Sequence, residues 1–435
     1  MFFVKIFNHI NRYLSSDINK KIATSSFWIL TGNIISKGTL LVATILMARF
    51  LSKEEYGQFG IIKSTILMFA MFAGMELGIT ATKYISQYKK TDKLKVQKIV
   101  GLSNLIAIII SIILSIAIYC FAKPIAEQIS APNLYVEIRI SAFILFFSSI
   151  NGIQTGILNG MEMFKEASFI NVFAGIISSI LLIISSIYFG LKGVVFAFGS
   201  NFIILFVFNF YVLKRSFYKD FDIKILSKDN FDEISVIWKF SLPAIFAGLM
   251  VGPVTWLCNY LLVNQLNGYK EMANFDIANQ WRNTILFIPV ALSQIALPLL
   301  SSSINDKEQY GMIFKKNLKL NLYIASVFVI FFIIITPVIV WFYGENYNDI
   351  KIPLIIMFIT TGFIAINNVI GQAIASQGKM WIGFFVNFLW AGVLIGLSYL
   401  FIVIFNMGAS GISLAYLISY IFHTVVQFLY IKRFI

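Results

Sequence analysis

Long apolar runs follow one another along almost the whole chain. Each contains about 20 residues or more, the length that an α-helix needs to cross a hydrocarbon core of about 30 Å. With 59% hydrophobic and 12% charged residues and a mean hydropathy of +0.83, the chain is also more apolar than soluble globular proteins. The runs predict an all-α integral membrane protein with twelve transmembrane helices, at residues 22–49, 57–82, 99–121, 136–160, 167–189, 192–213, 236–263, 275–300, 319–342, 352–376, 380–405 and 408–431.

The lysines and arginines are distributed unequally between the two sides that these spans define. With the amino terminus placed in the cytoplasm, 24 of the 34 lie in cytoplasmic segments, seven lie on the opposite side and three lie within spans. Cytoplasmic loops of membrane proteins carry such an excess of positive charge. The asymmetry predicts that both termini are cytoplasmic, and it explains the net charge of +14 without a nucleic-acid partner.

The sequence divides into two similar halves. EEYGQF at 54–59 resembles KEMANF at 270–275, an offset of 216 positions, and further short matches recur at nearly the same offset. Because each half holds six spans, an even number, we expect two lobes in a parallel repeat, related by an axis along the membrane normal, around a central cavity. The predicted parts are an N-terminal six-helix lobe at 1–213, a cytoplasmic linker at 214–235 and a C-terminal six-helix lobe at 236–435.

The sequence contains no pattern typical of an enzyme or of a metal centre. His9 and His423 lie at opposite ends of the chain, and the two cysteines lack metal-ligand spacing. GQFGIIKST at 57–65 is faintly similar to a phosphate-binding loop, but it lacks the Gly-Lys pair of that motif. We therefore expect a transporter without cofactor or metal ion. The first 20 residues lack the apolar core of a signal peptide and are expected to form a short interfacial segment.

Lys37 lies near the middle of the first span, where insertion of a lysine costs about 2.5–3.5 kcal/mol. Ser26, Asn33, Lys37 and Thr44 follow at intervals of seven, four and seven residues, so they share one face of the helix. One interpretation is a helix contact in which neighbouring amides satisfy the lysine. The other, which we favour, is a substrate-binding lysine in a wet cavity between the lobes, with Asn33 of the same face as a further substrate-binding residue, because ionisable groups inside membranes usually mark transport paths.

Two further cations lie within spans, at corresponding places in the two halves. Lys63 aligns at offset 216 with Asn279, and Asn279, Arg282 and Asn283 share one helix face. We predict that these four residues contribute to substrate binding, although both cations are close enough to the outer ends of their spans to reach lipid head groups. Arg49, at the end of the first span, is expected to be an interface anchor.

Acidic residues are scarce inside the predicted spans. Glu76, toward the cytoplasmic end of the second span, is the candidate for coupling to protons or cations, and its alternative role is a local ion pair. Asp276 stands near the start of the eighth span and is expected to be exposed on the outer side.

Amide side chains recur in the fourth and tenth spans. Amides often join membrane helices, but they also bind sugar hydroxyls. A cavity lined by cations and amides would suit an amphiphile that carries phosphate and sugar, whereas a cationic drug requires the opposite charge. The amides predicted to bind substrate are Asn151, Gln154, Asn367 and Gln372.

Three stretches of the chain carry a resemblance to a known family: TSSFWILTGNIISKGTLLVATILMARFLSKEEYGQFGI, GMELGITATKYISQY and GIQTGILNGMEMFKEASFINV. They resemble the Wzx-type polysaccharide biosynthesis flippases of the multidrug/oligosaccharidyl-lipid/polysaccharide exporter superfamily. The resemblance implies translocation of an undecaprenyl-diphosphate-linked oligosaccharide, such as an O-antigen or capsule repeat unit, from the cytoplasmic to the periplasmic leaflet of a bacterial inner membrane. It also implies alternating access driven by membrane potential or an ion gradient, with a polysaccharide polymerase and a chain-length regulator as candidate partners.

Two other functions stay open from the sequence. A multidrug antiporter of the same superfamily shares the fold, but this sequence lacks the acidic site expected in its first lobe. A membrane glycan polymerase or ligase has a similar number of spans, but such an enzyme is expected to carry a large external loop with arginine and histidine, which this sequence lacks.

Overall fold

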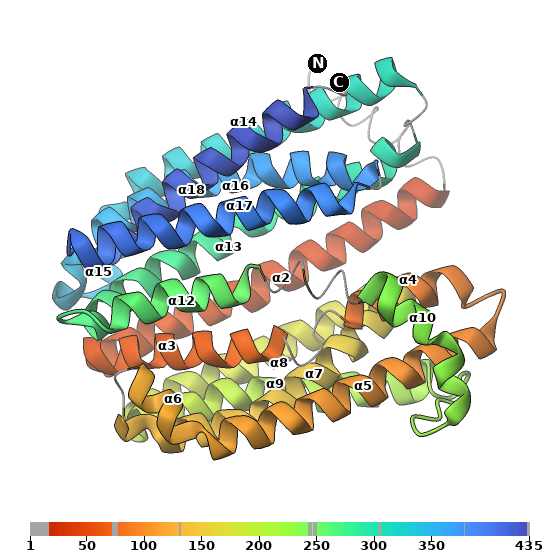
Figure 1. Cartoon of the computed structure of the whole chain (residues 1–435), viewed down its shortest axis with the longest axis horizontal. Helices are drawn as coiled ribbons and strands as arrows, with labels where there is room; N and C mark the ends of the chain where they lie inside the picture. The colour runs from red at the N-terminus through yellow and green to blue at the C-terminus, as the bar shows by residue number, and fades with distance from the viewer. Residues whose placement is uncertain are drawn as a thin grey trace.

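The computed structural model of the chain is a bundle of α-helices (Figure 1). It describes residues 17–71, 77–129, 132–241, 246, 250–302, 306–377 and 379–432, and no β-strand occurs among them. The helices of the N-terminal half are α2 (Asp17–Phe50), α3 (Lys53–Ala70), α4 (Leu77–Tyr88), α5 (Lys93–Cys120), α6 (Ala122–Gln128), α7 (Tyr135–Gly160), α8 (Phe164–Tyr188) and α9 (Gly190–Ser216). The 3-10 segment η3 (Lys228–Glu233), α10 (Ile234–Val236) and the π-helical η4 (Ile237–Ser241) lead into the second half. Its helices are α12 (Gly252–Val263), α13 (Gly268–Ser302), α14 (Lys307–Ile334), α15 (Thr336–Tyr343), the 3-10 segment η5 (Glu345–Ile350), α16 (Lys351–Ser376), α17 (Met380–Ser398), the π-helical η6 (Tyr399–Ile404) and α18 (Gly408–Ile431).

These helices confirm the predicted all-α membrane protein. In the described part of the chain, nine helices are long and apolar enough to cross a membrane, judged by length and composition. The three other predicted spans, 57–82, 236–263 and 275–300, include positions outside the residues that the structure describes with their side chains. The count of twelve spans therefore stays a prediction.

Corresponding helices of the two halves begin in the same way. Asp92 and Asp306 stand directly before α5 and α14, and the carboxylate of each accepts the backbone N–H three residues later. Such a cap satisfies one of the free donors at a helix N-terminus. Gly190 and Gly408 are the first residues of α9 and α18, and both have a positive φ, of 57° and 53°. The paired helix starts are what a duplicated chain would show.

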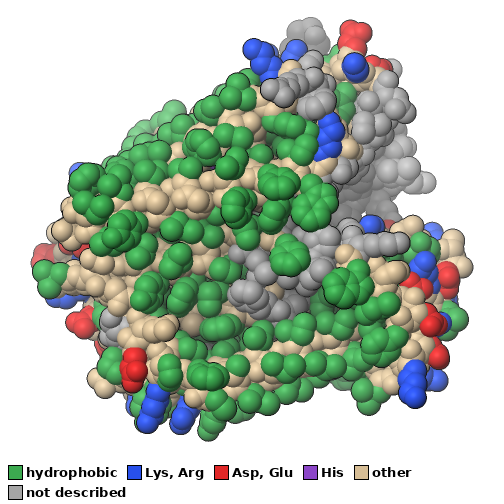
Figure 2. All heavy atoms as spheres, viewed as in Figure 1, with side chains coloured by type: hydrophobic (Ala, Val, Ile, Leu, Met, Phe, Trp, Pro, Cys, Tyr) green, Lys and Arg blue, Asp and Glu red, His purple; other side chains and the backbone are tan. Residues whose placement is uncertain are grey.

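The helices form two lobes that meet at one end and diverge at the other (Figure 1). At the first end, a single apolar core joins α3, α7 and α9 of one lobe to α12, α13 and α16 of the other. Toward the second end the core is divided, with one cluster around Leu77 and Ile157 and a separate one around Phe314 and Val369. Figure 2 shows the molecular outline notched between the lobes there. We name these the closed end, where α2 finishes and α13 begins, and the open end, where α2 begins and α18 finishes.

The predicted linker is folded against the N-terminal lobe. Phe217 and Phe221 are buried in the apolar cluster of that lobe. The carboxylate of Asp232 accepts a hydrogen bond from Lys98 of α5 at 2.6 Å. These contacts attach the linker to the open end of one lobe, so it is more than a loose tether. The boundaries of the lobes and linker in the sequence stay a prediction.

Glycines let α4 and α7 cross at close range inside the N-terminal lobe. A Cβ at Gly156 would overlap with the carbonyl oxygen of Gly78, and a Cβ at Gly78 would overlap with that of Gly152. Small residues allow membrane helices to approach in this way. The stretch GIQTG, from Gly152 to Gly156, thus has a packing role in this lobe.

We expect Gly156→Val to destabilise the N-terminal lobe, because the added side chain overlaps with helix backbone that cannot turn away as a side chain could. Overpacking of this kind costs about 1–3 kcal/mol or more. Melting of the detergent-solubilised protein, followed by size-exclusion chromatography after heating, should show a lower melting temperature. The control is Gly392→Val in α17, where a Cβ has no neighbour within 4 Å. Equal melting temperatures of the two variants would contradict the assignment.

Candidate functional site

Contacts between the lobes form three layers, which follow one another from the closed end toward the open end. The outer layer joins the end of α2 and the start of α3 to α15 and η5. Arg49 Nε and Nη2 donate to the carbonyl oxygens of Phe342 and Trp341 at 2.6 and 3.1 Å. Lys53 Nζ donates to the carboxylate of Asp349 at 3.2 Å. Carbonyls in the last turn of a helix lack intrahelical partners and favour a cation, so Arg49 links the lobes in addition to any anchoring role at the membrane surface.

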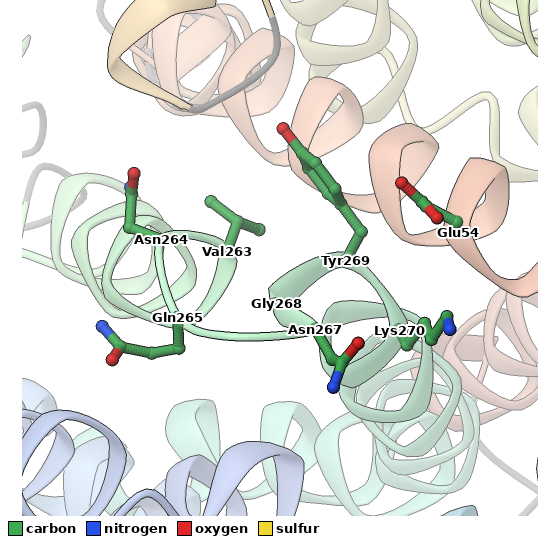
Figure 3. A pocket seen from close by; sticks show the side chains of 8 residues that line it. All are labelled: Glu54, Val263, Asn264, Gln265, Asn267, Gly268, Tyr269 and Lys270. Carbon is green, nitrogen blue, oxygen red and sulfur yellow. The ribbon is translucent and has the colours of Figure 1, made fainter.

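The outer layer is flanked by two open recesses. One, of about 400 Å³, includes Arg49 and Lys53 in its lining. The other, of about 330 Å³, is shown in Figure 3, where Tyr269 and Lys270 from the start of α13 lie near Glu54 of α3. Tyr269 Oη also donates to the carbonyl oxygen of Ile129 in the other lobe, at 2.7 Å. These recesses are on the outside of the closed end, away from the notch between the lobes.

We expect Arg49→Gln to weaken the closed end. The side chain is exposed, and solvent screening limits its contribution to about 1 kcal/mol, which corresponds to about a fivefold rise in the ratio of open to closed molecules. Distances between spin labels at Glu127 and Leu266, on different lobes, would measure this ratio in a cysteine-free background. Lys123→Gln is the control, because Lys123 contacts Tyr135 of its own lobe. Identical distance distributions in both variants would exclude a linking role for Arg49.

The middle layer holds an ion pair between the lobes. Lys63 Nζ of α3 lies 2.7 Å from the carboxylate of Asp276 on α13. The expectation that Asp276 is exposed was wrong, since only 4% of its surface is accessible. The reason is that α13 begins at Gly268, so Asp276 is already two turns inside the helix and faces the other lobe. Lys63, predicted to bind substrate, is neutralised by Asp276 in this conformation.

Two glycines of α3 bring the backbones of α3 and α13 together in the middle layer. A Cβ at Gly57 would overlap with the carbonyl group of Tyr269, and a Cβ at Gly60 would touch the side chain of Asp276. The glycines of GQFGIIKST therefore serve helix packing. Hydrogen bonds from α12 extend the layer: Trp256 Nε1 donates to Thr65 Oγ1 at 2.9 Å, and Asn259 Nδ2 donates to Ser64 Oγ at 2.9 Å.

The inner layer is formed by the polar face of α2 against α13. Gln280 Nε2 donates to Thr44 Oγ1 at 2.7 Å. Two helical turns further toward the open end, Lys37 Nζ lies 5.0 Å from the ring centroid of Phe287. No carboxylate among the described residues lies within ion-pair distance of Lys37, which is only half-buried. Asn33, one turn further, is also half-buried. Lys37 thus lies on the open-end side of the described contacts between α2 and α13.

Arg282 faces a different direction from Lys63. Its guanidinium is buried on α13 and lies 5.1 Å from the ring of Tyr416 on α18 of the same lobe. Nη2 donates to Asn283 Oδ1 at 3.3 Å, whereas Nε and Nη1 have no partner among the described residues. Asn279 is half-buried, and its Oδ1 likewise has no partner in the part of the chain that the structure describes. The two cations expected to line one cavity therefore point to different neighbours in this conformation, Lys63 to α13 and Arg282 to α18.

The predicted amides lie inside the lobes. Asn151 Nδ2 donates to the carbonyl oxygen of Phe202 at 2.6 Å and so joins α7 to α9. Gln154 and Asn367 are buried, and the side-chain oxygen of each has no partner within the described part of the chain. Gln372 is half-buried on α16. Their binding of glycan stays a prediction. Glu76 lies outside the described residues.

Sequence reasoning missed Asp276 and Gln280 as residues of the interface. One signal could have revealed Asp276. At offset 216 it corresponds to Gly60, and positions related by a twofold repeat face each other where helices cross near its axis. Because Gly60 has no side chain, it leaves room for the carboxylate of Asp276 at the corresponding position of the other half. No comparable signal exists for Gln280.

The fold is shared with known membrane transporters. The structure matches the lipid II flippase MurJ, in an inward closed conformation, with a TM-score of 0.75 at 17% identity, over 93% of this chain and 87% of that one. It matches an inward-facing multidrug resistance transporter of the MATE family with a TM-score of 0.73 at 17% identity, over 94% and 97%. At such identities these matches define the fold alone. The chain therefore has the same fold as these two proteins.

The sequence itself defines the family. A family model described as polysaccharide biosynthesis protein matches residues 22–304, well over half of the chain. The chain therefore belongs to the polysaccharide biosynthesis protein family, which confirms the family predicted from the three stretches. A curated relative, the EPS I polysaccharide export inner membrane protein EpsE of Ralstonia solanacearum, is 26% identical over 196 residues, 43% of this chain and 44% of EpsE. The match thus spans less than half the length of that relative.

Proposed function

We propose that the chain is a flippase that moves an undecaprenyl-diphosphate-linked oligosaccharide, such as an O-antigen or another surface polysaccharide unit, across a bacterial inner membrane. The observation that carries the proposal is Lys37, a half-buried cation without an acidic partner among the described residues, on the face of α2 that meets α13 of the other lobe. A diphosphate offers the charge that this lysine lacks. Membership of the polysaccharide biosynthesis protein family and the EpsE relative support a glycan as cargo.

The conformation supports alternating access. The three layers close one end, and the divided core and the notch leave the other end open. If both termini are cytoplasmic, as the distribution of lysines and arginines predicts, the open end faces the cytoplasm and would admit the diphosphate head group from the inner leaflet. Opening of the closed end would then release it to the periplasmic leaflet. A polysaccharide polymerase and a chain-length regulator are the partners we propose downstream.

The ratio of basic to acidic groups between the lobes favours an anionic cargo over a cationic drug. Among the described residues of the middle and inner layers, Lys37 and Lys63 stand against the single carboxylate of Asp276. A multidrug antiporter that exports cations would need an excess of acid in the same place. We therefore rank drug export second.

Deletion of the gene tests the proposal. We expect cells without the protein to accumulate lipid-linked repeat units in the inner leaflet and to lose the surface glycan, with both defects restored by the intact gene. Normal glycan display together with increased drug sensitivity would favour the antiporter. Accumulation of single repeat units in the outer leaflet would instead indicate a polymerase.

A further inference from the structure

Asp276 cannot be explained by anion binding. It is an acid placed against one of the cations that the proposed cargo would need, and in this conformation it already neutralises Lys63 at 2.7 Å. Acids are costly at this depth unless paired, because a buried carboxylate without a partner loses its hydration. An acid at the contact between two moving lobes therefore needs a partner both when the lobes are together and when they are apart.

The surroundings of Asp276 offer it one charged partner and several neutral ones. Lys63 of α3 pairs with it directly, and Tyr56 of α3 and Tyr343 of α15 lie within the range of electrostatic interaction with its carboxylate. Tyr347 of η5 completes the group through ring contacts with Tyr56 and Tyr343, at 6.3 and 5.8 Å between centroids. The hydroxyls of Tyr56 and Tyr347 are buried without partners among the described residues. Once α3 moves away with Lys63 and Tyr56, the neutral phenol of Tyr343 stays in the same lobe as this carboxylate.

The ion pair must break when the closed end opens. Lys63 belongs to the N-terminal lobe and Asp276 to the C-terminal lobe. Because Gly60 has no side chain, the backbone of α3 lies close to the aspartate. Separating the lobes at this layer removes the ammonium from the carboxylate. A carboxylate deprived of its cation among apolar and phenolic neighbours takes up a proton more readily than a paired one, since a nearby positive charge is what favours its ionised form.

We propose that Asp276 is a proton-binding site that couples movement of the lobes to a proton gradient, exchanging Lys63 for a proton when the closed end opens. This inference rests on the proposed function, because it names the ion that drives the same transporter. On the side of the closed end, the carboxylate accepts one proton from water and becomes a neutral carboxyl. When the lobes close again, the carboxyl gives that proton to water on the side of the open end and pairs with Lys63. One proton thus crosses in the direction opposite to the cargo, and no other group changes its charge.

The exchange also frees Lys63 at the useful moment. While Asp276 is protonated, the ammonium of Lys63 has no counter-charge and can accompany a diphosphate through the opened end. When the cargo has left, re-formation of the ion pair favours closing. The same lysine would therefore alternate between the cargo and the aspartate.

The test measures the distance between spin labels at Glu127 and Leu266 in proteoliposomes without any glycan, from pH 5 to pH 8. The state in which the lobes have separated at the closed end binds one more proton than the state seen here. Its population should therefore rise as pH falls, by up to about tenfold per pH unit. In Asp276→Asn the population should be high and independent of pH. Lys63→Gln should flatten the pH dependence, because without the ammonium the carboxylate of Asp276 binds a proton almost equally well in both positions of the lobes.

Two controls separate proton binding from the mere loss of an ion pair. Asp349→Asn breaks a second ion pair between the lobes, that with Lys53, at an exposed carboxylate, and should keep the pH response. His423→Gln removes the histidine buried in α18 and should keep it as well. A flat wild-type response, an unchanged response in Asp276→Asn, or a response to sodium ions at constant pH would each overturn the proposal. Since no lipid-linked glycan is used, the result is independent of whether the proposed cargo is correct.

Discussion

Lys37→Gln is expected to abolish export of lipid-linked glycan in cells that contain the variant at the normal level. Glutamine keeps much of the length and polarity of lysine but removes the charge, and Lys37 lies half-buried on the face of α2 that meets α13 of the other lobe. A hydrogen bond to a charged group contributes about 1.5–3 kcal/mol, so a single lost contact already lowers binding about 10- to 150-fold. Surface glycan and inner-leaflet lipid-linked units, measured together, report the loss.

Lys37→Arg should retain part of the activity, because it keeps the charge in a different shape. The matched control is Lys165→Gln. Lys165 also packs on an aromatic ring, that of Trp28 on α2 at 5.3 Å, but it is exposed on α8 of the same lobe. We expect normal export from that control. Equal export by Lys37→Gln and the unaltered protein would contradict a role for the charge and favour a purely structural lysine.

The sequence predicts the helices well because hydrophobicity alone determines which segments enter a membrane. The face of α2 that carries Lys37 and Thr44 also follows from helical spacing, and the structure places both residues against α13. What the sequence cannot predict is which helices meet. The partner of Lys63 lies 213 residues away, and only the crossing of α3 and α13 brings Asp276 to it.

Contacts with helix ends are also difficult to predict from the sequence. From its place after an apolar run, Arg49 is expected to be an interface anchor. In the structure its side chain donates to carbonyl oxygens in the last turn of α15 in the other lobe. Those carbonyls can accept from Arg49 because α15 ends at Tyr343, before the positive φ of Gly344, and within the described chain that of Trp341 otherwise accepts only the N–H of Gly344, at 3.2 Å. The role of the arginine thus depends on a helix end nearly 300 residues away in the sequence.

The interface combines two electrostatic zones. In the outer and middle layers each described cation has an acceptor from the other lobe: carbonyls for Arg49, Asp349 for Lys53 and Asp276 for Lys63. In the inner layer Lys37 has only an aromatic ring. The described cations of the outer and middle layers therefore have acceptors without cargo, whereas the charge of Lys37 has none from an acid among the described residues.

Gly57→Val is expected to prevent closure of the closed end and thereby to abolish export. A Cβ at position 57 would overlap with the carbonyl group of Tyr269, so α3 and α13 could approach only by a shift of helix backbone. Each lobe should still fold, because its open-end core is a cluster of its own. The spin labels at Glu127 and Leu266 should report a separated closed end at every pH.

Gly371→Val in α16, where a Cβ meets nothing within 4 Å, should leave distances and export unchanged. A Gly57→Val protein that closes and exports normally would show that the contact between α3 and α13 is dispensable, and the middle layer would then lose its place in the transport cycle.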